Sequence, residues 1–523
     1  MTTAQHTRRL GLLMVAASAL LAWLIAHTDV FFADGLRYIA QAKTIDHGSW
    51  TQGLVHAVDH PIYPMAIAAV HRLLGGNDPN DWQTAAQVAA AISGVLLVIP
   101  IYLSSLEVFG PSSAWLACFL IYLLPFNGHM LADTLSESTF LLFWTWGLWS
   151  TLRFLRAGGP FWVPLSIAFS VLAYLTRPEG LILPVALLAT IVLLSLFCSD
   201  EIPRAKRWWA IGVLVMGPIL MAGPFMMMKG GISTKPSILR ILGLGRAAPA
   251  MAVERERPLD AEQTTAKTVA LAAKAMIRAI DGATSLPLLL LAPMGITASL
   301  SSPVRRRYLL LLGMIVVLSA LAMMRLHAMS GYCTPRHAMV VAWILIPASA
   351  AGLNRLAGAL AQAIAKLARK EAFWPKLESA IRLVAVVCCF VHWGPAAVAS
   401  IDPGFHGYRQ AGEWLASLAR PGEGVVDPKG YSLFYAGKPG YTFATLVQGV
   451  HDPSVRWVVA HEALVFGPWD YSKAVRTLVA DRRPIRVFPA KPAHRVSKVY
   501  LYDLAGPGER TAGAVDPVSQ SRR

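Results

Sequence analysis

The sequence has 523 residues, of which 55% are hydrophobic and only 15% charged, and its mean hydropathy is +0.49. Soluble domains carry about 25% charged residues, so this composition excludes an ordinary soluble protein and indicates a chain that lies largely in lipid. The net charge of +17 comes from Lys and Arg in short segments between apolar runs, as in topology determinants. No basic stripe interleaved with aromatic residues is present, and a nucleic-acid partner is not expected.

The first apolar run follows Arg8 and Arg9. Its core of about 17 residues exceeds the length of a signal-peptide core, about 7–15 residues, and further apolar runs follow it. The pattern therefore predicts an uncleaved first transmembrane helix with a cytoplasmic N-terminus.

A helix needs about 20 mainly apolar residues to cross a bilayer. Eleven segments are predicted to do so: 10–27, 82–105, 112–126, 137–155, 161–176, 180–198, 208–228, 284–302, 308–325, 337–354 and 381–400. Lys and Arg gather in alternate connections, which the positive-inside rule places in the cytoplasm. The long segments 28–81 and 229–283 then lie on the opposite, outer face.

The C-terminal region has a different pattern. An odd number of spans places it outside, and residues 403–505 contain short strand-like runs such as "VRWVVAHEAL" and "SKVYLYDL" with helical stretches near 407–419 and 470–482. This alternation predicts a small extracytoplasmic α/β domain. Residues 1–402 are the predicted transmembrane domain, and the tail 506–523 is predicted to be disordered.

The chain has five cysteines, an odd number, and most lie in apolar runs. No CxxC or Cys/His ligand spacing occurs, so neither a disulfide framework nor a zinc site is expected.

The ionisable residues next to the apolar runs fall mainly on the outer face. Any one of them can be an interfacial side chain whose charged end reaches water. Ionisable groups near membrane depth are costly, however, and several on one face favour a shared site. They are Asp34, Asp59, His60, Asp133, Glu137, Arg177, Glu179, Lys229, Lys235, Arg325, His327 and Arg336.

The first outer loop contains two short helical patterns. Apolar residues in 34–48 recur at helical spacing, and "HPIYPMAIAAVHRLLGG" (60–76) is a second segment opened by proline. Both are too short or too polar to span the bilayer, so they are predicted to lie along the interface as a shelf above a lipid headgroup.

These motifs resemble those of GT-C glycosyltransferases. The acid Asp34 after the first span, the "HPIYP" motif, "LSESTFLLF" (135–143), "TRPEGLILP" (176–184) and "YCTPRHAMVVAWILIP" (332–347) occur in the order such proteins show. Within that superfamily the motifs look like those of family 39, the protein O-mannosyltransferases and aminoarabinose-transferase-like bacterial relatives. The resemblance covers almost the whole chain and implies a GT-C fold in a bacterial inner membrane.

The resemblance also implies a reaction. Such an enzyme takes a sugar from a polyprenyl-phosphate donor and transfers it, with inversion, to an acceptor on the outer face. Asp34 corresponds to the presumed general base, since a carboxylate can accept the proton of an attacking hydroxyl. The sugar is not identified, and the acceptor is a glycan, a lipid or a protein.

The leaving lipid phosphate needs cationic donors. Arg177 and Arg336 are the first candidates, followed by Lys229, Lys235 and His60. The remaining candidates for substrate binding are Arg37, Tyr38, Tyr63, Asp133, Glu137, Glu179, Arg325 and His327.

One position departs from the family pattern. Many relatives carry a second acid directly after the first, and here Gly35 follows Asp34. No metal or other cofactor is therefore assigned, although a divalent ion stays open. Glu137 is either the missing carboxylate or the partner of a nearby arginine. Arg177 and Glu179 flank Pro178 and can equally be a structural ion pair.

Two other classes of function remain. A transporter or flippase of lipid-linked sugars is expected to carry inverted repeats and midplane ionisable groups, whereas the groups here gather at one face. A non-catalytic envelope assembly protein, with a ligand-binding outer domain, is the third class.

Overall fold

The computed structural model describes residues 2–197, 203–235, 238–239, 241, 243, 265–369, 371–401, 403–467, 470–480, 482–489 and 497–505. Two compact units divide the described chain, one ending at Ile401 and the other following it. The predicted disordered tail, 506–523, lies outside the described residues.

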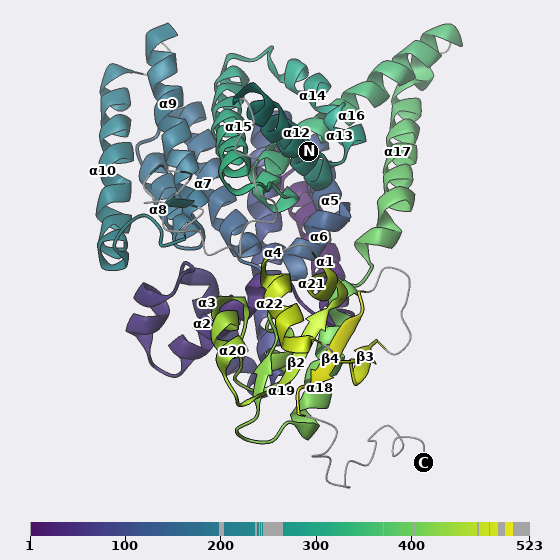
Figure 1. Ribbon diagram of the computed structural model, residues 1–523. Coiled ribbons are helices and arrows are strands. Elements are labelled where there is room, and N and C mark those ends of the chain that lie inside the picture. Colours follow the sequence, from purple (N-terminus) through teal and green to yellow (C-terminus); the bar gives the residue numbers. More distant parts are fainter. Residues whose placement is uncertain are drawn as a thin grey trace. The chain divides into compact units, whose positions relative to one another are not determined.

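The first unit is a helical membrane domain (Figure 1). Seven of its described helical segments are long and apolar enough to cross a bilayer; at 1.5 Å per residue, 20 residues reach about 30 Å. They are α1 (Thr3–Ala26), α4 (Pro79–Phe109), η2 with α9 (Pro178–Leu181, Ile182–Phe197), α10 (Arg204–Lys229), α15 (Pro303–Ser330), η4 with α16 (Pro335–Ala338, Met339–Leu367) and α17 (Trp374–Ala397).

Bent pairs account for up to two further spans. Helices α5 (Pro111–Leu123) and α6 (Pro125–Ala132) meet at 74°, and α12 (Thr265–Thr284) meets the segment of α13 (Leu286–Leu289) and α14 (Ala292–Ser299) at 96°. The expected eleven spans are thus not confirmed, since the described residues provide seven to nine.

Two predicted spans have clear reasons for the difference. Helix α8 (Trp162–Tyr174) has only 13 residues, which is too short to cross the bilayer alone. Helix α7 (Glu137–Ala157) has 21 residues, which is long enough to cross a bilayer, but its Trp, Ser and Thr residues and charged ends lower its hydropathy, so it is not among the seven apolar segments. It is largely buried among other helices, so it meets little lipid.

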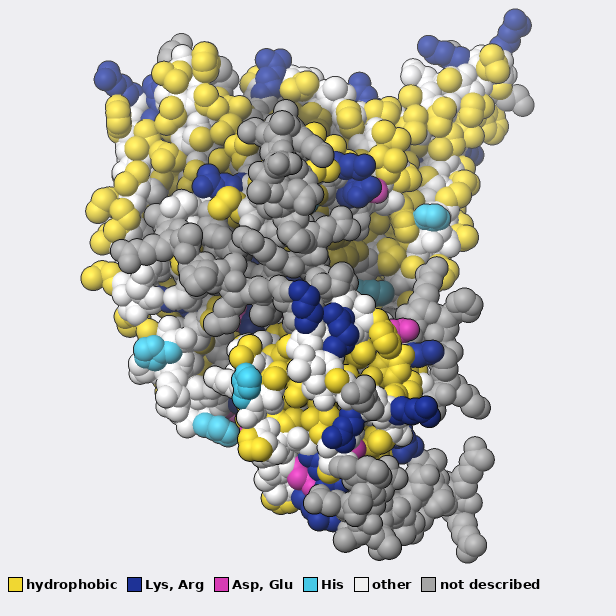
Figure 2. Space-filling model, viewed as in Figure 1, with side chains coloured by type: hydrophobic (Ala, Val, Ile, Leu, Met, Phe, Trp, Pro, Cys, Tyr) yellow, Lys and Arg dark blue, Asp and Glu magenta, His cyan; other side chains and the backbone are white. Residues whose placement is uncertain are grey.

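The outer surfaces of several helices are apolar. Figure 2 shows hydrophobic side chains over the helices of the membrane unit, with Lys and Arg at helix ends. Helix α10 exposes Val215, Met216, Ile219 and Leu220. Soluble monomers rarely expose large contiguous apolar patches, so these faces indicate contact with lipid.

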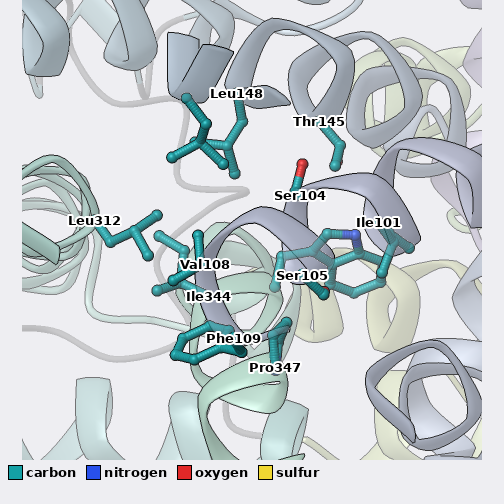
Figure 3. A pocket seen from close by; sticks show the side chains of 12 residues that line it. Ile101, Ser104, Ser105, Val108, Phe109, Thr145, Leu148, Leu312, Ile344 and Pro347 are labelled. Atoms are coloured by element: carbon teal, nitrogen blue, oxygen red, sulfur yellow. The ribbon is translucent and has the colours of Figure 1, made fainter. Parts of the chain in front are cut away.

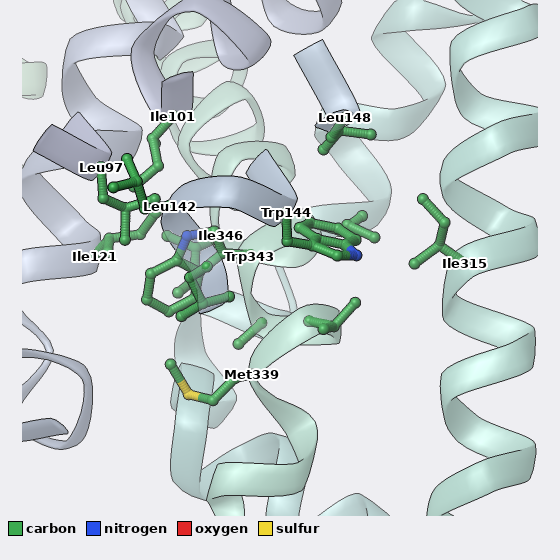
Figure 4. Packing of buried hydrophobic residues seen from close by; sticks show 14 of the residues in the cluster. Leu97, Ile101, Ile121, Leu142, Trp144, Leu148, Ile315, Met339, Trp343 and Ile346 are labelled. Carbon is green, nitrogen blue, oxygen red and sulfur yellow. The ribbon is translucent and has the colours of Figure 1, made fainter. Parts of the chain in front are cut away.

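The interior is packed from α4, α7, α15 and α16 (Figure 4). Trp144 and Ile315 are fully buried, and Trp343 nearly so. Small residues allow close approach elsewhere: a Cβ on Gly352 of α16 would lie 2.0 Å from the carbonyl oxygen of Leu291. Membrane helices gain stability from such close packing because lipid supplies no hydrophobic drive between them.

The two predicted helices of the first loop are confirmed. They are α2 (Asp34–Asp46) and α3 (Ile62–Leu74), joined through the single turn η1 (Gln52–His56). Helix α2 buries Tyr38, Ile39, Ala42 and Ile45 on one face, which is the helical spacing seen in the sequence. Helix α3 packs on both α2 and α4.

The second unit is a small α/β domain, as predicted. Its sheet has the order β1-β2-β4-β3, with β1 and β2 parallel and the other pairs antiparallel. Val458 pairs with Tyr502 across β2 and β4, and both are buried in its core. The strands are β1 (Gly424–Val426), β2 (Val455–His461), β3 (Arg486–Phe488) and β4 (Val499–Asp503).

Helices and single turns complete the described elements. Those of the second unit are η6 (Pro403–Phe405), α18 (His406–Leu418), α19 (Tyr431–Ala436), η7 (Phe443–Thr445), α20 (Leu446–His451), α21 (Glu462–Phe466) and α22 (Asp470–Val479); η5 (Glu371–Phe373) precedes α17 in the first.

Candidate active site

Eight charged side chains of alternating sign form a continuous series of ion pairs in the membrane unit. We call this series the charge network. Its members come from the first loop, the starts of α7 and α16, the turn before α9 and the segment after α10. In order of contact they are Lys235, Asp59, Arg37, Asp34, Arg336, Glu137, Arg177 and Glu179.

Arg336 lies at the centre of the charge network. Its Nη1 donates to Oδ2 of Asp34 at 2.7 Å. On its other side, Nε and Nη2 both lie 2.6 Å from Oε1 of Glu137. The same oxygen lies 2.8 Å from Nη1 of Arg177, whose Nη2 donates to Glu179 at 2.8 Å. Glu137 therefore holds two arginines side by side.

The other arm of the network lies in the first loop. Arg37, one turn after Asp34, lies 3.1 Å from that carboxylate and donates Nε to Oδ2 of Asp59 at 3.1 Å. Nζ of Lys235 lies 2.7 Å from Oδ1 of Asp59. Two cations thus flank each of the two aspartates.

Three acids of the charge network lie at the N-terminal ends of helices. Asp34, Glu137 and Glu179 each stand in the first turn of their helix. The positive end of the helix dipole stabilises a negative charge there. The local sequence thus favours ionised carboxylates at the sites where the arginines meet them.

The charges keep the first-loop acids ionised. Burial opposes ionisation of Asp34, but the charges of Arg336 and Arg37 outweigh it and lower its pKa to about 2. Burial likewise opposes ionisation of Asp59, and Lys235 and Arg37 hold its pKa below the usual value. Both groups are carboxylates at neutral pH.

Gly35 is required by the packing of α2. A Cβ at this position would lie 1.9 Å from Oγ1 of Thr134 and 2.6 Å from the ring of Phe31. No side chain, and therefore no second acid, fits there unless Thr134 and Phe31 shift. The departure from the family pattern has a steric origin in this chain.

Asp133 accepts hydrogen bonds from the backbone next to the start of α2. Its Oδ1 accepts the backbone N–H groups of Phe32 at 3.1 Å and Thr134 at 2.6 Å. Burial raises the pKa of Asp133 to about 6, against the opposing effect of these donors. The carboxyl joins the segment before Asp34 to the segment before α7, which is a positioning contact.

His60 and Lys229 lie beside the network. Burial, with the charges of Lys229 and Lys235, lowers the pKa of His60 to about 3, so its ring is neutral at physiological pH. The ammonium of Lys229 donates to the carbonyls of Ala57 and Asp59 at 2.9 and 3.0 Å. It anchors the first loop to the end of α10.

The two tyrosines of the first loop are buried. The hydroxyl of Tyr38 lies 3.0 Å from Oγ of Ser136, next to Glu137 in sequence. Tyr63 donates to the carbonyl of Ala86 at 3.0 Å, and the two rings meet edge to face. Tyr63 therefore fastens α3 to α4, whereas Tyr38 lies against the start of α7.

Arg325 and His327 lie on α15. Among the described residues, no ion pair or hydrogen bond joins either side chain to the charge network, and Arg325 is exposed. The structure thus brings together eight charged residues but leaves these two candidates apart from them.

Sequence reasoning missed two features. The sequence places Asp59 among the outer-face acids without indicating a role, whereas in the structure it joins Lys235 to Arg37. Phe32, whose ring centroid lies 4.7 Å from the guanidinium of Arg336, was not singled out. The sequence marks Phe32 only by its aromatic side chain two positions before Asp34.

The acidic side chains of the charge network are paired with basic side chains. Within the described ranges, no three His, Cys, Asp or Glu side chains are placed to hold one. The carboxylates of the network face guanidinium and ammonium groups, which repel a second cation, and Gly35 excludes a neighbouring acid.

A separate pocket lies between α4, α7, α15 and α16 (Figure 3). Its lining is mainly apolar and includes Ile101, Leu312 and Trp343. Of the α7 residues that line the pocket, Thr145 is the nearest in sequence to Glu137. It lies two turns farther along the helix, at a distance of about 12 Å. The pocket is thus distinct from the charge network.

Comparisons with known proteins agree with this architecture. Residues 59–222 match the family described as dolichyl-phosphate-mannose-protein mannosyltransferase. That match includes Asp59, Glu137 and Arg177 but not Asp34 or Arg336. None of the curated proteins compared with the chain matches it.

Solved structures share the fold over most of the chain. The structure of ArnT from Cupriavidus metallidurans in the apo state has a TM-score of 0.62 at 12% identity and covers 97% of this chain and 100% of its own. The same protein bound to undecaprenyl phosphate has a TM-score of 0.59 at 14% identity, with 95% and 99% covered. The oligosaccharyltransferase of Archaeoglobus fulgidus has a TM-score of 0.54 at 13% identity, with 86% and 69% covered.

The predicted resemblance and fold type are therefore confirmed. The chain has a GT-C fold with a small C-terminal α/β unit and resembles the protein mannosyltransferases and ArnT. The predicted enzyme class, glycosyltransferase, is that of the matched mannosyltransferase family and of the archaeal oligosaccharyltransferase.

Proposed function

We propose that this chain, whose fold is that of the GT-C glycosyltransferases, transfers a sugar from a polyprenyl-phosphate donor to an acceptor hydroxyl on the outer face of a bacterial inner membrane. The observation that carries this proposal is the 2.7 Å contact between Asp34 and Arg336. It combines a group that can accept a proton with a group that can bind a phosphate, next to the first loop of a membrane domain.

Asp34 is the proposed general base. The acceptor oxygen forms a bond to the anomeric carbon, and the bond from that carbon to the phosphate oxygen breaks. The acceptor proton passes to Asp34, and the electron pair of the broken bond leaves on the polyprenyl phosphate. Attack opposite to the leaving group inverts the configuration. A carboxylate within hydrogen-bond reach is suited to this proton transfer.

Arg336 and Arg177 are the proposed ligands of the phosphate. The phosphate gains negative charge as it leaves, and fixed guanidinium groups stabilise that charge in the transition state. Glu137 holds both guanidinium groups in place, so they need little reorganisation. Lys235 and Arg37 add positive charge on the other side of Asp34, while neutral His60 can donate one N–H.

The two ends of α7 differ in charge, which indicates the side of the membrane on which each lies. Its start carries Glu137 and the charge network, whereas its last turns carry Arg153 and Arg156, both paired with Glu107 of α4. Connections rich in arginine remain in the cytoplasm. The network then lies on the opposite face, with the N-terminus cytoplasmic and the C-terminal unit outside.

Transport and assembly are the alternative classes. A transporter is expected to hold its ionisable groups near the midplane, on interrupted helices in matching halves. The charge network instead stands at helix starts, in line with chemistry at one face. An assembly protein would not need Asp34 for any turnover.

The test uses purified protein, a panel of radiolabelled polyprenyl-phosphate sugars, and bacterial membrane extract as the source of acceptors. Wild-type protein is expected to transfer one sugar, and Asp34→Asn is expected to lose transfer. The matched control is Asp46→Asn, an acid on the same helix paired with Arg72, which is expected to keep transfer. Unchanged transfer in Asp34→Asn removes the base assignment, and no transfer by wild type with any donor favours the other classes.

A further inference from the structure

Each cation of the charge network lies within ion-pair distance of at least one carboxylate of the network. Four basic and four acidic groups balance one another. An anionic ligand that binds a network arginine must therefore compete with a carboxylate for that arginine. Binding of such a ligand to Arg336 requires that one carboxylate partner of Arg336 dissociates from it.

The contacts of Arg336 identify the weaker partner. Glu137 engages two nitrogens of the guanidinium, Nε and Nη2, and its side chain is only 2% exposed. Asp34 engages the single nitrogen Nη1, and its side chain is 25% exposed. Leaving Glu137 would strand a buried carboxylate, which is costly, whereas Asp34 can turn toward solvent or toward an acceptor hydroxyl.

Asp34 faces positive charge on several sides. Arg37 comes from its own helix, Arg336 from the start of α16 and Lys235 from the segment after α10, while Glu137 faces Arg336 from α7. Held between Arg336 and Arg37, Asp34 is a weak base. Removing the contact with Arg336 makes it a stronger one, because burial then opposes its ionisation with less compensation.

We propose that the donor phosphate displaces Asp34 from Nη1 of Arg336, so that binding of the donor releases the catalytic base, while Glu137 acts as a positioning residue that retains Arg336. This inference rests on the proposed function and deepens it. The base becomes competent for proton transfer only where a phosphate already occupies the arginine, which couples donor binding to activation of the acceptor.

Equilibrium binding of a polyprenyl monophosphate without sugar tests the competition independently of catalysis. If Asp34 competes for Arg336, removing its charge strengthens phosphate binding. Asp34→Asn is expected to bind undecaprenyl phosphate about tenfold more tightly than wild type, the effect of one partly buried ion pair. Asp34→Ala serves as the second variant, and thermal melts of both confirm folding.

Two controls separate competition from a general change in charge. Asp59→Asn removes the same charge from the same network, but its partners are Arg37 and Lys235, so a gain of no more than about twofold is expected from screened charge. In an Arg336→Gln background, Asp34→Asn is expected to give no gain, since the contested contact is gone.

Each result decides the inference. Equal or weaker binding by both Asp34 variants overturns it, as does an equal gain in Asp59→Asn or a full gain in the Arg336→Gln background. Wild-type protein that binds no undecaprenyl phosphate at all contradicts the proposed function instead, so the two failures are distinguishable.

Discussion

Arg336 and Asp34 are 302 positions apart in the sequence, yet Nη1 of the arginine donates to Oδ2 of the aspartate at 2.7 Å. The contact joins the first loop to the start of α16. Through Glu137 and Arg177 it extends to the starts of α7 and α9. One guanidinium thus connects the proposed base to the proposed phosphate ligands.

Replacement of Arg336 is expected to impair sugar transfer both when its charge is lost and when only the shape of its guanidinium group is lost. Arg336→Gln removes a donor to the developing phosphate charge and should lower kcat/KM about 1,000-fold. Arg336→Lys keeps the charge but cannot contact Asp34 and Glu137 from opposite edges, so a loss of about 100-fold is expected. Steady-state kinetics with the identified donor measures both. Arg355→Gln, an exposed arginine farther along α16, is the control; recovery of full activity by lysine would contradict the geometric role.

Glu137→Gln is expected to destabilise the membrane unit. The change leaves two arginines without a shared carboxylate in a buried position, and breaking a buried pair costs about 3 kcal/mol. A lower thermal midpoint in detergent is the expected readout. Glu179→Gln removes the terminal acid of the network, whose side chain is 29% exposed and pairs with one arginine, Arg177, so a smaller loss of stability is expected. Equal shifts for the two variants would show that burial of Glu137 does not matter.

Gly35→Ala is expected to displace α2. Its methyl group would overlap Thr134 and Phe31, and overpacking of this kind costs about 1–3 kcal/mol. Thermal stability and transfer should both fall. Adding Thr134→Gly removes the closest atoms and should restore part of the stability. If Gly35→Ala matches wild type in both measurements, the steric account of this position is wrong.

The carboxyl group of Asp133 is expected to make the stability of the protein depend on pH. Its pKa of about 6 is above the value of about 3.9 for an unfolded chain. Between these values the folded state binds more protons, so the free energy of unfolding falls as pH rises through this window. Asp133→Asn stays neutral and keeps an oxygen acceptor. Relative to wild type it should become more stable by about 2 kcal/mol between pH 4 and pH 7.

Melting curves of wild type and Asp133→Asn at both pH values measure this difference. A difference in stability that is constant with pH would show that the carboxyl ionises normally in the folded protein.

Much of the local structure was predictable from the sequence. Helices α2 and α3 and the strands of the C-terminal unit follow from periodicity, because each depends on residues close together in the chain. The span count was less accessible. Nothing in the apolar run 161–176 reveals that only 13 of its residues form α8. Pro125 marks the break between α5 and α6, but the angle of 74° between them depends on packing with other helices.

The sequence by itself determined the membrane class, the helical first loop and the supply of charged residues at one face, because composition, periodicity and charge bias are local properties. Only the tertiary structure decided which of these charges meet. Asp59 joined the network and Arg325 did not, because helix packing sets the distance between groups that are far apart in the chain. The same packing explains Gly35: the space beside Asp34 is filled by Thr134, from a different part of the sequence.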